Sequence, residues 1–549
     1  MNDPVFGEGA LLALHSGLAL VGIGAFAWRR TIHLMRYFQQ EEYDSPRFWA
    51  WVRDNRAFDR RGTVVAVPVA VAMVLTHMFW YAVLGEAIGG MVGLLVMARG
   101  EVDPRVTGKK KLVMTQRATR IHRLAMALFA LFCVPFVLLL LFAGGAFGPA
   151  LAWGWLAVLL QITPFFLMLA ERLLAPGEKR IQDTFQAEAK KILADVHPTI
   201  IGITGSYGKT STKMILGELL SADAPTFWTA KSINTPMGVT REIREKMKAH
   251  HTWAVMEMGA YNIGSVKRLC DFTPPKAAIV TAVGIMHLER FGSPENVYKA
   301  KSELAQAVPA DGILVCNGDD PGARRMATEF PKKTTLLYGF VGDGLACSMT
   351  DVSTTPEGSR FTLHWQGKAY PGSTPLHGRP MLSNLMAAFT MAAAQGVHPD
   401  VLLAVIRTLK PVENRLQVQV NGAVTWLHDA YNSNPAGFDA ALDVLGTMPG
   451  TRRILVTPGM VELGDQQYER NREVAAKAAR VCDLVLLVGD TNRVALATGL
   501  REGGAKDSAV RWFARRDDAF AALQKEQAAG DVVLVENDLP DLYEGTVVL

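Results

Sequence analysis

The sequence predicts a helical membrane domain followed by two α/β domains. Apolar runs of about 20 residues, the length that spans a bilayer, lie within residues 1–174 between segments rich in Arg and Lys. From residue 198 onward, short β-type runs alternate with helical patterns, which is typical of a parallel sheet. We therefore expect a transmembrane domain (1–174), a linker helix (175–197), a central domain (198–410) and a C-terminal Rossmann-like domain (411–549).

Composition excludes several classes of protein. The 57 Lys and Arg against 52 Asp and Glu give a net charge of +5, which is too small to suggest a nucleic-acid partner. The five cysteines are scattered without a C-x-x-C pair, so neither a disulfide framework nor a zinc site is indicated. A reducing compartment is expected for the soluble part.

The first apolar run, residues 10–28, ends at Trp28-Arg29-Arg30. Asp3 and Glu8 precede it without any Lys or Arg, which favours a retained helix with its N-terminus outside over a cleaved signal peptide. Residues 29–61 and 99–123 each hold eight basic residues, which places both segments in the cytoplasm. An even number of crossings must join them, so residues 64–98 are expected to form a hairpin of two spans or a re-entrant pair.

A second hairpin is predicted from residues 124–144 and 151–170, which returns the chain to the cytoplasm at Glu171-Arg172. The prediction is a multi-pass protein of the cytoplasmic membrane with about five spans and with its later domains in the cytoplasm. Residues 36–51 mix aromatic and charged side chains, and the sequence leaves open an interfacial helix or a substrate-facing loop.

A glycine-rich loop, residues 202–212, organises the central domain. It reads GITGSYGKTST, follows the β-type run 199–201 and precedes the helical pattern 213–220. This order predicts a phosphate cradle, because glycines let backbone N–H groups turn toward an anion at a helix N-terminus. Lys209 would reach the outer phosphates, and the Thr210 hydroxyl would bind the accompanying Mg²⁺. Ile203 stands where the strict motif has its first glycine.

Polar residues follow the later β-type runs of the central domain. Glu257 and His287 come just after two of them, where each could bind Mg²⁺ near the phosphates. Glu257 alone is equally compatible with a charge at a helix N-terminus. Residues 335–375 predict a β-meander, and residues 382–410 predict two helices. The C-terminal domain lacks G-x-G-x-x-G, so a dinucleotide is not implied.

Six motifs in order make residues 198–549 resemble the Mur ligases, the ATP-dependent amino-acid and peptide ligases of peptidoglycan synthesis. The branch that adds D-alanyl-D-alanine is the most similar. The glycine loop resembles the family's G-x-T-G-S-N-G-K-T-T-T. The other five matches are Ser232–Val239, Glu257-Met-Gly-Ala, His287–Ser293 with Ala300–Glu303, Asn414-Arg415-Leu416 and Asp429–Pro435.

The resemblance implies a mechanism and a set of site residues. A carboxylate attacks the γ-phosphate of ATP to give an acyl phosphate, and an amine then displaces phosphate. Two Mg²⁺ ions and a carbamylated Lys301 are part of the implied site. The implied catalytic residues are Lys209, His287, Lys301 and Arg415; the nucleotide-binding residues are Gly205, Ser206, Gly208, Lys209, Thr210, Ser211, Asn384, Arg415 and Asp429; the metal ligands are Thr210, Glu257, His287 and Lys301; and the substrate-side residues are Asn234, Tyr431, Asn432, Asn434 and Glu462.

Several positions depart from the family pattern. Ala282 replaces an Asn, Pro380-Met381 replaces H-N, and Pro458-Gly459 removes the Asp of G-D-M-x-E-L-G. Residues 536–541 read ENDLPD where the family has K-G-S-R. These changes put D-alanyl-D-alanine in doubt as the incoming amine.

The N-terminus departs most, because membrane spans stand in place of the family's soluble domain for a UDP-sugar. Our hypothesis is that the carboxylate acceptor is lipid-linked or a growing polymer, joined to an amino acid or peptide amine. Two alternatives remain: a tethered ligase of UDP-muramoyl tripeptide with D-alanyl-D-alanine, and a transporter or channel regulated by a non-ligating ATP-binding domain. Membrane lipids are expected partners, nucleic acid is not, and an oligomer is compatible with the sequence.

Overall fold

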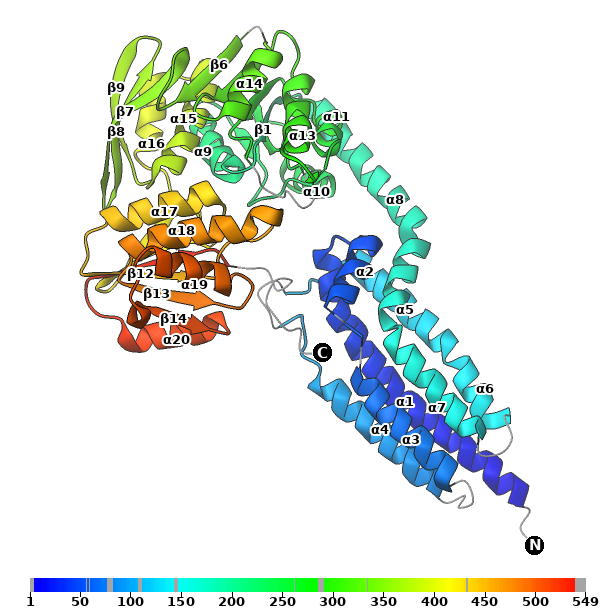
Figure 1. The fold of residues 1–549 in the computed structure, drawn as a ribbon. Helices are drawn as coiled ribbons and strands as arrows, with labels where there is room; N and C mark the ends of the chain where they lie inside the picture. Colours follow the sequence, from blue (N-terminus) through cyan, green and yellow to red (C-terminus); the bar gives the residue numbers. More distant parts are fainter. Residues whose placement is uncertain are drawn as a thin grey trace. The chain divides into compact units, whose positions relative to one another are not determined.

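The computed structural model describes residues 4–55, 57–58, 60–76, 82–106, 111–142, 147–260, 262–284, 291–332, 334–430 and 433–538 (Figure 1). These residues form two compact units, one within residues 1–181 and the other comprising residues 182–539. Each unit is described by itself below.

The first unit is helical. Its helices α1, α3, α4 and α7 pack along one another around an apolar core that includes Phe26, Phe129 and Trp153. The helices are α1 (Pro4–Gln40), α2 (Ser45–Asp54), α3 (Arg60–Thr76), α4 (Ala82–Gly100), α5 (Gln116–Phe132), α6 (Val134–Phe142), α7 (Phe147–Gln161) and α8 (Thr163–Val196), of which the part up to Ile181 belongs to this unit.

A few buried polar side chains are hydrogen-bonded inside this unit, and large apolar side chains lie on its outside as well as in its core. His15 and Thr31 are fully buried; the Trp153 Nε1 atom donates to His15 Nε2 at 3.0 Å, and Thr31 Oγ1 lies 3.1 Å from His122 Nε2. Large apolar side chains are exposed on the outside, Leu75 at 74% and Phe142 at 78%. This distribution suits a hydrocarbon solvent better than water.

Within the described residues, two helical stretches are long and apolar enough to cross a membrane, Ala10–Gln40 and Gln116–Phe142. Ala150–Gln161 and Thr163–Val196 meet at a 61° bend and add a third if they form one broken span. The predicted hairpin at 64–98 corresponds to α3 and α4, which pack together. The total of five spans stays a prediction.

The structure adds detail at two segments, one left open by the sequence and one expected as a linker helix. The segment 36–51 forms the end of α1 and the helix α2, whose Phe48 and Trp51 are buried, with the Trp51 ring stacked 4.1 Å from that of Tyr37. This part is therefore a packed helix and not an open loop. The expected linker helix is also not a separate element, because α8 continues from Thr163 to Val196 through Pro176.

The second unit begins with a nine-stranded sheet in the order β2-β3-β1-β4-β5-β6-β7-β8-β9. Pairing is parallel from β2 to β7 and antiparallel from β7 to β9, which gives the predicted meander. The strands are β1 (Thr199–Thr204), β2 (Thr226–Trp228), β3 (Trp253–Glu257), β4 (Ala277–Val280), β5 (Ile313–Asn317), β6 (Thr334–Gly339), β7 (Leu345–Thr355), β8 (Gly358–Trp365) and β9 (Lys368–Thr374).

Helices cover this sheet, and α9 packs with α15 (Figure 1). The glycine loop joins β1 directly to α9, so the helix N-terminus opens at the carboxyl edge of the parallel strands. The helices are α9 (Lys209–Ser221), α10 (Pro236–Lys246), α11 (Ser265–Phe272), α13 (Pro294–Ala307), α14 (Pro321–Glu329), α15 (Arg379–Ala394) and α16 (Pro399–Ile406).

A six-stranded sheet in the order β10-β11-β15-β12-β13-β14 forms the C-terminal part, and all its pairs except β10–β11 are parallel. Its strands are β10 (Gln417–Asn421), β11 (Val424–Asp429), β12 (Arg452–Thr457), β13 (Leu484–Val488), β14 (Val510–Phe513) and β15 (Asp531–Glu536). The helices are α17 (Pro435–Thr447), α18 (Gln467–Val481), α19 (Arg493–Glu502) and α20 (Arg516–Glu526), with short 3₁₀ turns at Gly464–Gln466 and Asp507–Ala509.

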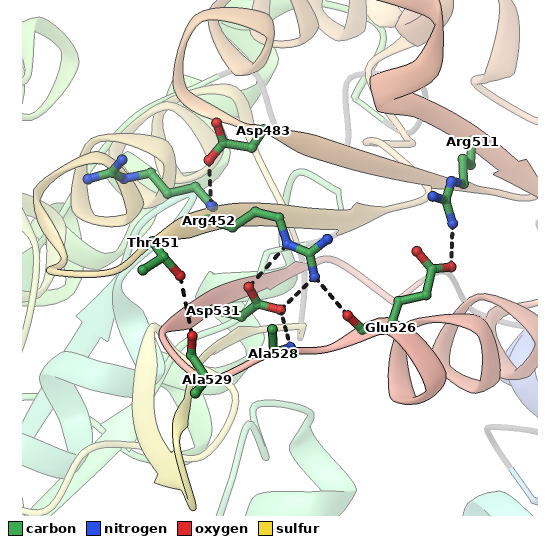
Figure 2. Close-up of polar contacts among 9 residues, drawn as sticks. Thr451, Arg452, Asp483, Arg511, Glu526, Ala528, Ala529 and Asp531 are labelled. Atoms are coloured by element: carbon green, nitrogen blue, oxygen red, sulfur yellow. Dashed lines mark hydrogen bonds and ion pairs between the residues drawn. The ribbon is translucent and has the colours of Figure 1, made fainter.

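An ion pair joins two register partners on β12 and β15. The Arg452 guanidinium donates to both oxygens of Asp531, at 3.1 and 2.7 Å, and the two residues are register partners (Figure 2). The Asp531 side chain is 1% exposed, and hydrogen bonds from Arg452 hold the pKa of its carboxyl below the usual value against the effect of burial. Because β15 carries Glu536 at its other end, this pair also positions one wall of the site described next.

Candidate active site

The glycine loop makes its turn in conformations that favour glycine. Gly205 and Gly208 have φ values of +155° and +83°. A Cβ atom on Gly205 would lie 1.9 Å from Thr281 Oγ1, and one on Gly208 would lie 2.3 Å from Asn384 Oδ1. The Ser206 hydroxyl donates to the Gly284 carbonyl at 2.8 Å, which ties the loop to the chain after β4. The loop therefore has room for backbone but not for side chains.

Lys209 begins α9 and folds back over the loop. Its ammonium donates to the carbonyl oxygens of Gly205 at 2.7 Å and Ser206 at 3.3 Å. Burial lowers the pKa of Lys209, while the nearby Glu257 carboxylate acts in the opposite direction. A cation held against the inner side of a phosphate cradle can move outward onto an anion that replaces those carbonyls.

Three of the predicted residues meet at the ends of β1 and β3. Thr210 Oγ1 donates to Glu257 Oε2 at 2.9 Å, and Asn234 Nδ2 donates to Glu257 Oε1 at 3.0 Å. The Glu257 side chain is almost wholly buried. A hydroxyl and a carboxylate in contact provide the oxygen donors that Mg²⁺ prefers, so these residues fit the predicted metal. Among the described residues, no group of three or more His, Cys, Asp or Glu side chains is arranged to hold a metal.

Lys301, on α13, is buried with 4% of its surface exposed. Burial lowers the pKa of its amine well below the usual value, and the charge of Lys209 lowers it further, against the effect of Asp320. This shift favours the neutral amine relative to an exposed lysine, and the neutral amine is the form that reacts with carbon dioxide to give a carbamate.

A cavity of about 390 Å³ opens beside the loop. It is lined from the central sheet and its helices and from the C-terminal part, both within the second unit. Six predicted residues line it: Gly208, Ser211, Asn384, Arg415, Asp429 and Asn434. The phosphate loop, an amide side chain and carboxylate groups therefore line the same cavity, which is large enough for part of a nucleotide.

Two carboxyls stand side by side in this cavity. Asp429 ends β11 and Glu536 ends β15, and they are register partners. Burial raises the pKa of Asp429 to about 6, against the effect of Arg415. Burial, followed by the charge of Asp429, raises the pKa of Glu536 well above its usual value. The pair is expected to keep a proton at neutral pH, since two adjacent buried carboxylates repel each other.

The remaining predicted residues are distributed as follows. His287, Tyr431 and Asn432 lie outside the described residues. Asn434 caps α17, where its Oδ1 accepts from the Gly437 amide at 3.0 Å. Glu462 follows β12 with a φ of +63° and does not line the cavity.

Two residues at the site were missed from the sequence. Lys213 contacts Glu257, its Nζ lying 3.2 Å from Oε2, and Glu536 joins Asp429. Lys213 lies four residues after Lys209, on the same face of α9, which is a signal that helical spacing contains. The only sequence signal for Glu536 is its position at the end of a β-type run.

Comparisons with known proteins agree with this geometry. The Mur ligase middle domain model matches residues 203–392, and the Mur ligase, glutamate ligase domain model matches residues 414–536. A UDP-N-acetylmuramoyl-tripeptide–D-alanyl-D-alanine ligase of Escherichia coli is 31% identical over 337 residues, which cover 60% of this chain and 74% of the relative. The enzyme of the same name from Mycobacterium tuberculosis is 32% identical over 365 residues, which cover 62% of this chain and 70% of the relative.

A solved structure is similar as well. The MurF ligase from Thermotoga maritima in complex with ADP matches with a TM-score of 0.58 and 26% identity, over 65% of this chain and 80% of that one. The predicted fold of the two α/β domains and the predicted ligase activity are thereby confirmed. The chain belongs to the Mur ligase family, as a MurF-like, ATP-dependent peptide ligase.

Proposed function

We propose that this protein is a membrane-bound ligase that joins an amine to the carboxylate of a lipid-linked or polymeric cell-envelope acceptor. The observation that carries the proposal is the helical unit of residues 1–181, with apolar side chains outside and hydrogen-bonded polar groups inside. Its basic segments favour a cytoplasmic position for the ligase domains. A membrane substrate would then need no soluble UDP-sugar domain.

The chemistry of the proposal follows from the site. One carboxylate oxygen of the acceptor attacks the γ-phosphorus of ATP, ADP leaves, and an acyl phosphate forms. The amine nitrogen then attacks the acyl carbon, inorganic phosphate leaves and the nitrogen loses a proton. Lys209 would stabilise the transferring phosphoryl group, and Arg415 would neutralise the nucleotide from the other wall of the cavity.

Residues around Glu257 would hold magnesium. Thr210 and Glu257 would bind one ion and His287 with carbamylated Lys301 a second, as the family resemblance implies. When bound, these ions would neutralise phosphate charge during transfer. Asn384 would contact the nucleobase and Asp429 the ribose hydroxyls, since both line the cavity. Asn234 and Asn434 would lie on the substrate side.

A second candidate uses the same site on a soluble acceptor. The relatives are named for ligating D-alanyl-D-alanine to UDP-N-acetylmuramoyl tripeptide, and 31% identity to one of them favours that reaction. The membrane unit would then act only as a tether. The altered C-terminal motifs, including the segment 536–541 that does not match K-G-S-R, weigh against the same amine.

Phosphate release by the full-length protein in detergent tests both candidates. One series supplies UDP-muramoyl tripeptide with D-alanyl-D-alanine, and the other supplies membrane lipid extract with single amino acids. Lys209→Ala is the control for turnover at the site. Release only with lipid extract supports the membrane acceptor, whereas release with the soluble pair contradicts it. ATP turnover that needs neither substrate would favour a regulatory ATP-binding domain.

A further inference from the structure

Lys213 is a buried cation beside the carboxylate that the proposed function assigns to magnesium. Its side chain is fully buried and that of Glu257 is 2% exposed, with the Lys213 Nζ atom 3.2 Å from Glu257 Oε2. Buried ammonium groups are rare unless they are paired, so this contact requires a reason.

Both carboxylate oxygens of Glu257 accept hydrogen bonds in this structure. Oε2 accepts from both Thr210 and Lys213, and Oε1 accepts from Asn234. The acceptor is therefore satisfied, and its charge is balanced by an ammonium. A divalent cation that binds Glu257 through Oε2, the oxygen that Thr210 also contacts, would share that atom with Lys213.

Lys213 is held in place from the other side. Its ammonium also donates to the Lys231 carbonyl and to Thr229 Oγ1, the latter at 3.3 Å. Lys231 has a φ of +46°, a left-handed conformation that is uncommon outside glycine. The turn that carries Asn234 is thus tied to the same ammonium, so that Lys213 and Asn234, two of the three donors to Glu257, are positioned together.

The surroundings carry positive charge. Burial lowers the pKa of Lys213 from its ordinary value, the charges of Glu257 and Glu242 oppose that shift, and the charge of Arg415 adds to it. Lys209 lies close enough to Glu257 to interact with it as well. A divalent cation entering without an anion would meet these cations with one carboxylate at hand. The phosphates of a nucleotide would supply the missing negative charge.

We propose that Lys213 is a positioning residue that serves as the counter-ion of Glu257 before nucleotide binds. It would hold the carboxylate in its binding position and suppress metal binding until phosphates are present. Metal and nucleotide would then enter as one unit. The inference rests on the proposed role of Glu257 as a metal ligand.

Manganese titration of the full-length protein in detergent, followed by the loss of the free-ion paramagnetic resonance signal, tests this inference. Without nucleotide, wild type should bind Mn²⁺ weakly. Lys213→Met should bind at least about tenfold more tightly, because a unit positive charge next to the ligand is gone. Lys213→Arg keeps the charge and should remain weak. The double variant Lys213→Met with Glu257→Gln should lose the gain.

Equal Mn²⁺ affinity in folded Lys213→Met and wild type would overturn the inference. If Lys213→Met does not fold, wild type decides: Mn²⁺ binding that is tight without nucleotide and is abolished by Glu257→Gln would also overturn it. A further arm with a non-hydrolysable ATP analogue separates the two claims. If Glu257→Gln leaves nucleotide-dependent Mn²⁺ binding unchanged, the metal role of Glu257 itself fails, whatever Lys213 does.

Discussion

Gly208→Ala should impair ATP binding through a clash that can be located in the structure. Gly208 caps α9 with a φ of +83°, and its added Cβ atom would lie 2.3 Å from Asn384 Oδ1. An ordinary contact of carbon and oxygen is about 3.3 Å, so the Asn384 side chain must move by about 1 Å. Asn384 would thereby lose its hydrogen bond from Thr212 Oγ1, which is 3.3 Å long.

The chain offers a matched control for this substitution. Gly264 caps α11 with a φ of +89°, and a Cβ there meets nothing within 4 Å. Both variants carry the cost of a left-handed alanine, about 1 kcal/mol. Gly208→Ala adds about 1–2 kcal/mol for the displaced amide and its lost hydrogen bond.

Steady-state phosphate release at varied ATP concentration measures the difference. That added free energy corresponds to a rise of about tenfold in KM for ATP in Gly208→Ala. Gly264→Ala should keep the wild-type KM and lose only some thermal stability. An equal KM in the two variants would refute the account of why the loop needs glycine at this position.

Three further predictions concern charges. Glu536→Gln should raise the unfolding temperature at pH 8. The pKa of the Glu536 carboxyl is raised in the folded protein, so the folded state binds more protons than the unfolded state and wild type loses stability as pH rises. The gain in unfolding temperature should shrink toward pH 5, and an equal gain at both pH values would contradict this prediction. Arg452→Met should lower the unfolding temperature at pH 7 by an amount that corresponds to about 2 kcal/mol, since it leaves buried Asp531 unpaired. The exposed pair of Arg511 and Glu526 (Figure 2) is the control, and Arg511→Ala should cost less than about 1 kcal/mol. Removal of bicarbonate and carbon dioxide should lower ligase turnover, and adding them back should restore it. Mass spectrometry of the intact protein should show a labile carbamate that Lys301→Arg lacks. Turnover that does not depend on bicarbonate would argue against carbamylation.

The sequence predicts the order of elements well where local signals are strong. Glycine at positions 205 and 208, followed by Lys209, identifies a strand-loop-helix unit, and β1 and α9 are found there. Apolar runs with basic flanks likewise predict the helices of the first unit. The end of the membrane domain was placed at residue 174, whereas α8 continues through Pro176 and the first compact unit ends at Ile181.

Contacts between distant residues could not be read in this way. Lys213 meets Glu257 only because β1 and β3 are adjacent in the sheet, although 44 residues separate the two side chains. Asp429 meets Glu536 because β11 and β15 pair across more than a hundred residues. Strand order decides both contacts, and a single sequence does not specify that order.

Transfer of oxygen from the acceptor to phosphate tests the central claim most directly. The acceptor that supports phosphate release is labelled with oxygen-18 in its carboxylate, and the released phosphate is analysed by mass spectrometry. The account predicts that each turnover moves one labelled oxygen into phosphate, because the acyl phosphate breaks at the acyl carbon. Unlabelled phosphate would mean that water attacks ATP, and it would contradict ligation through an acyl phosphate at this site.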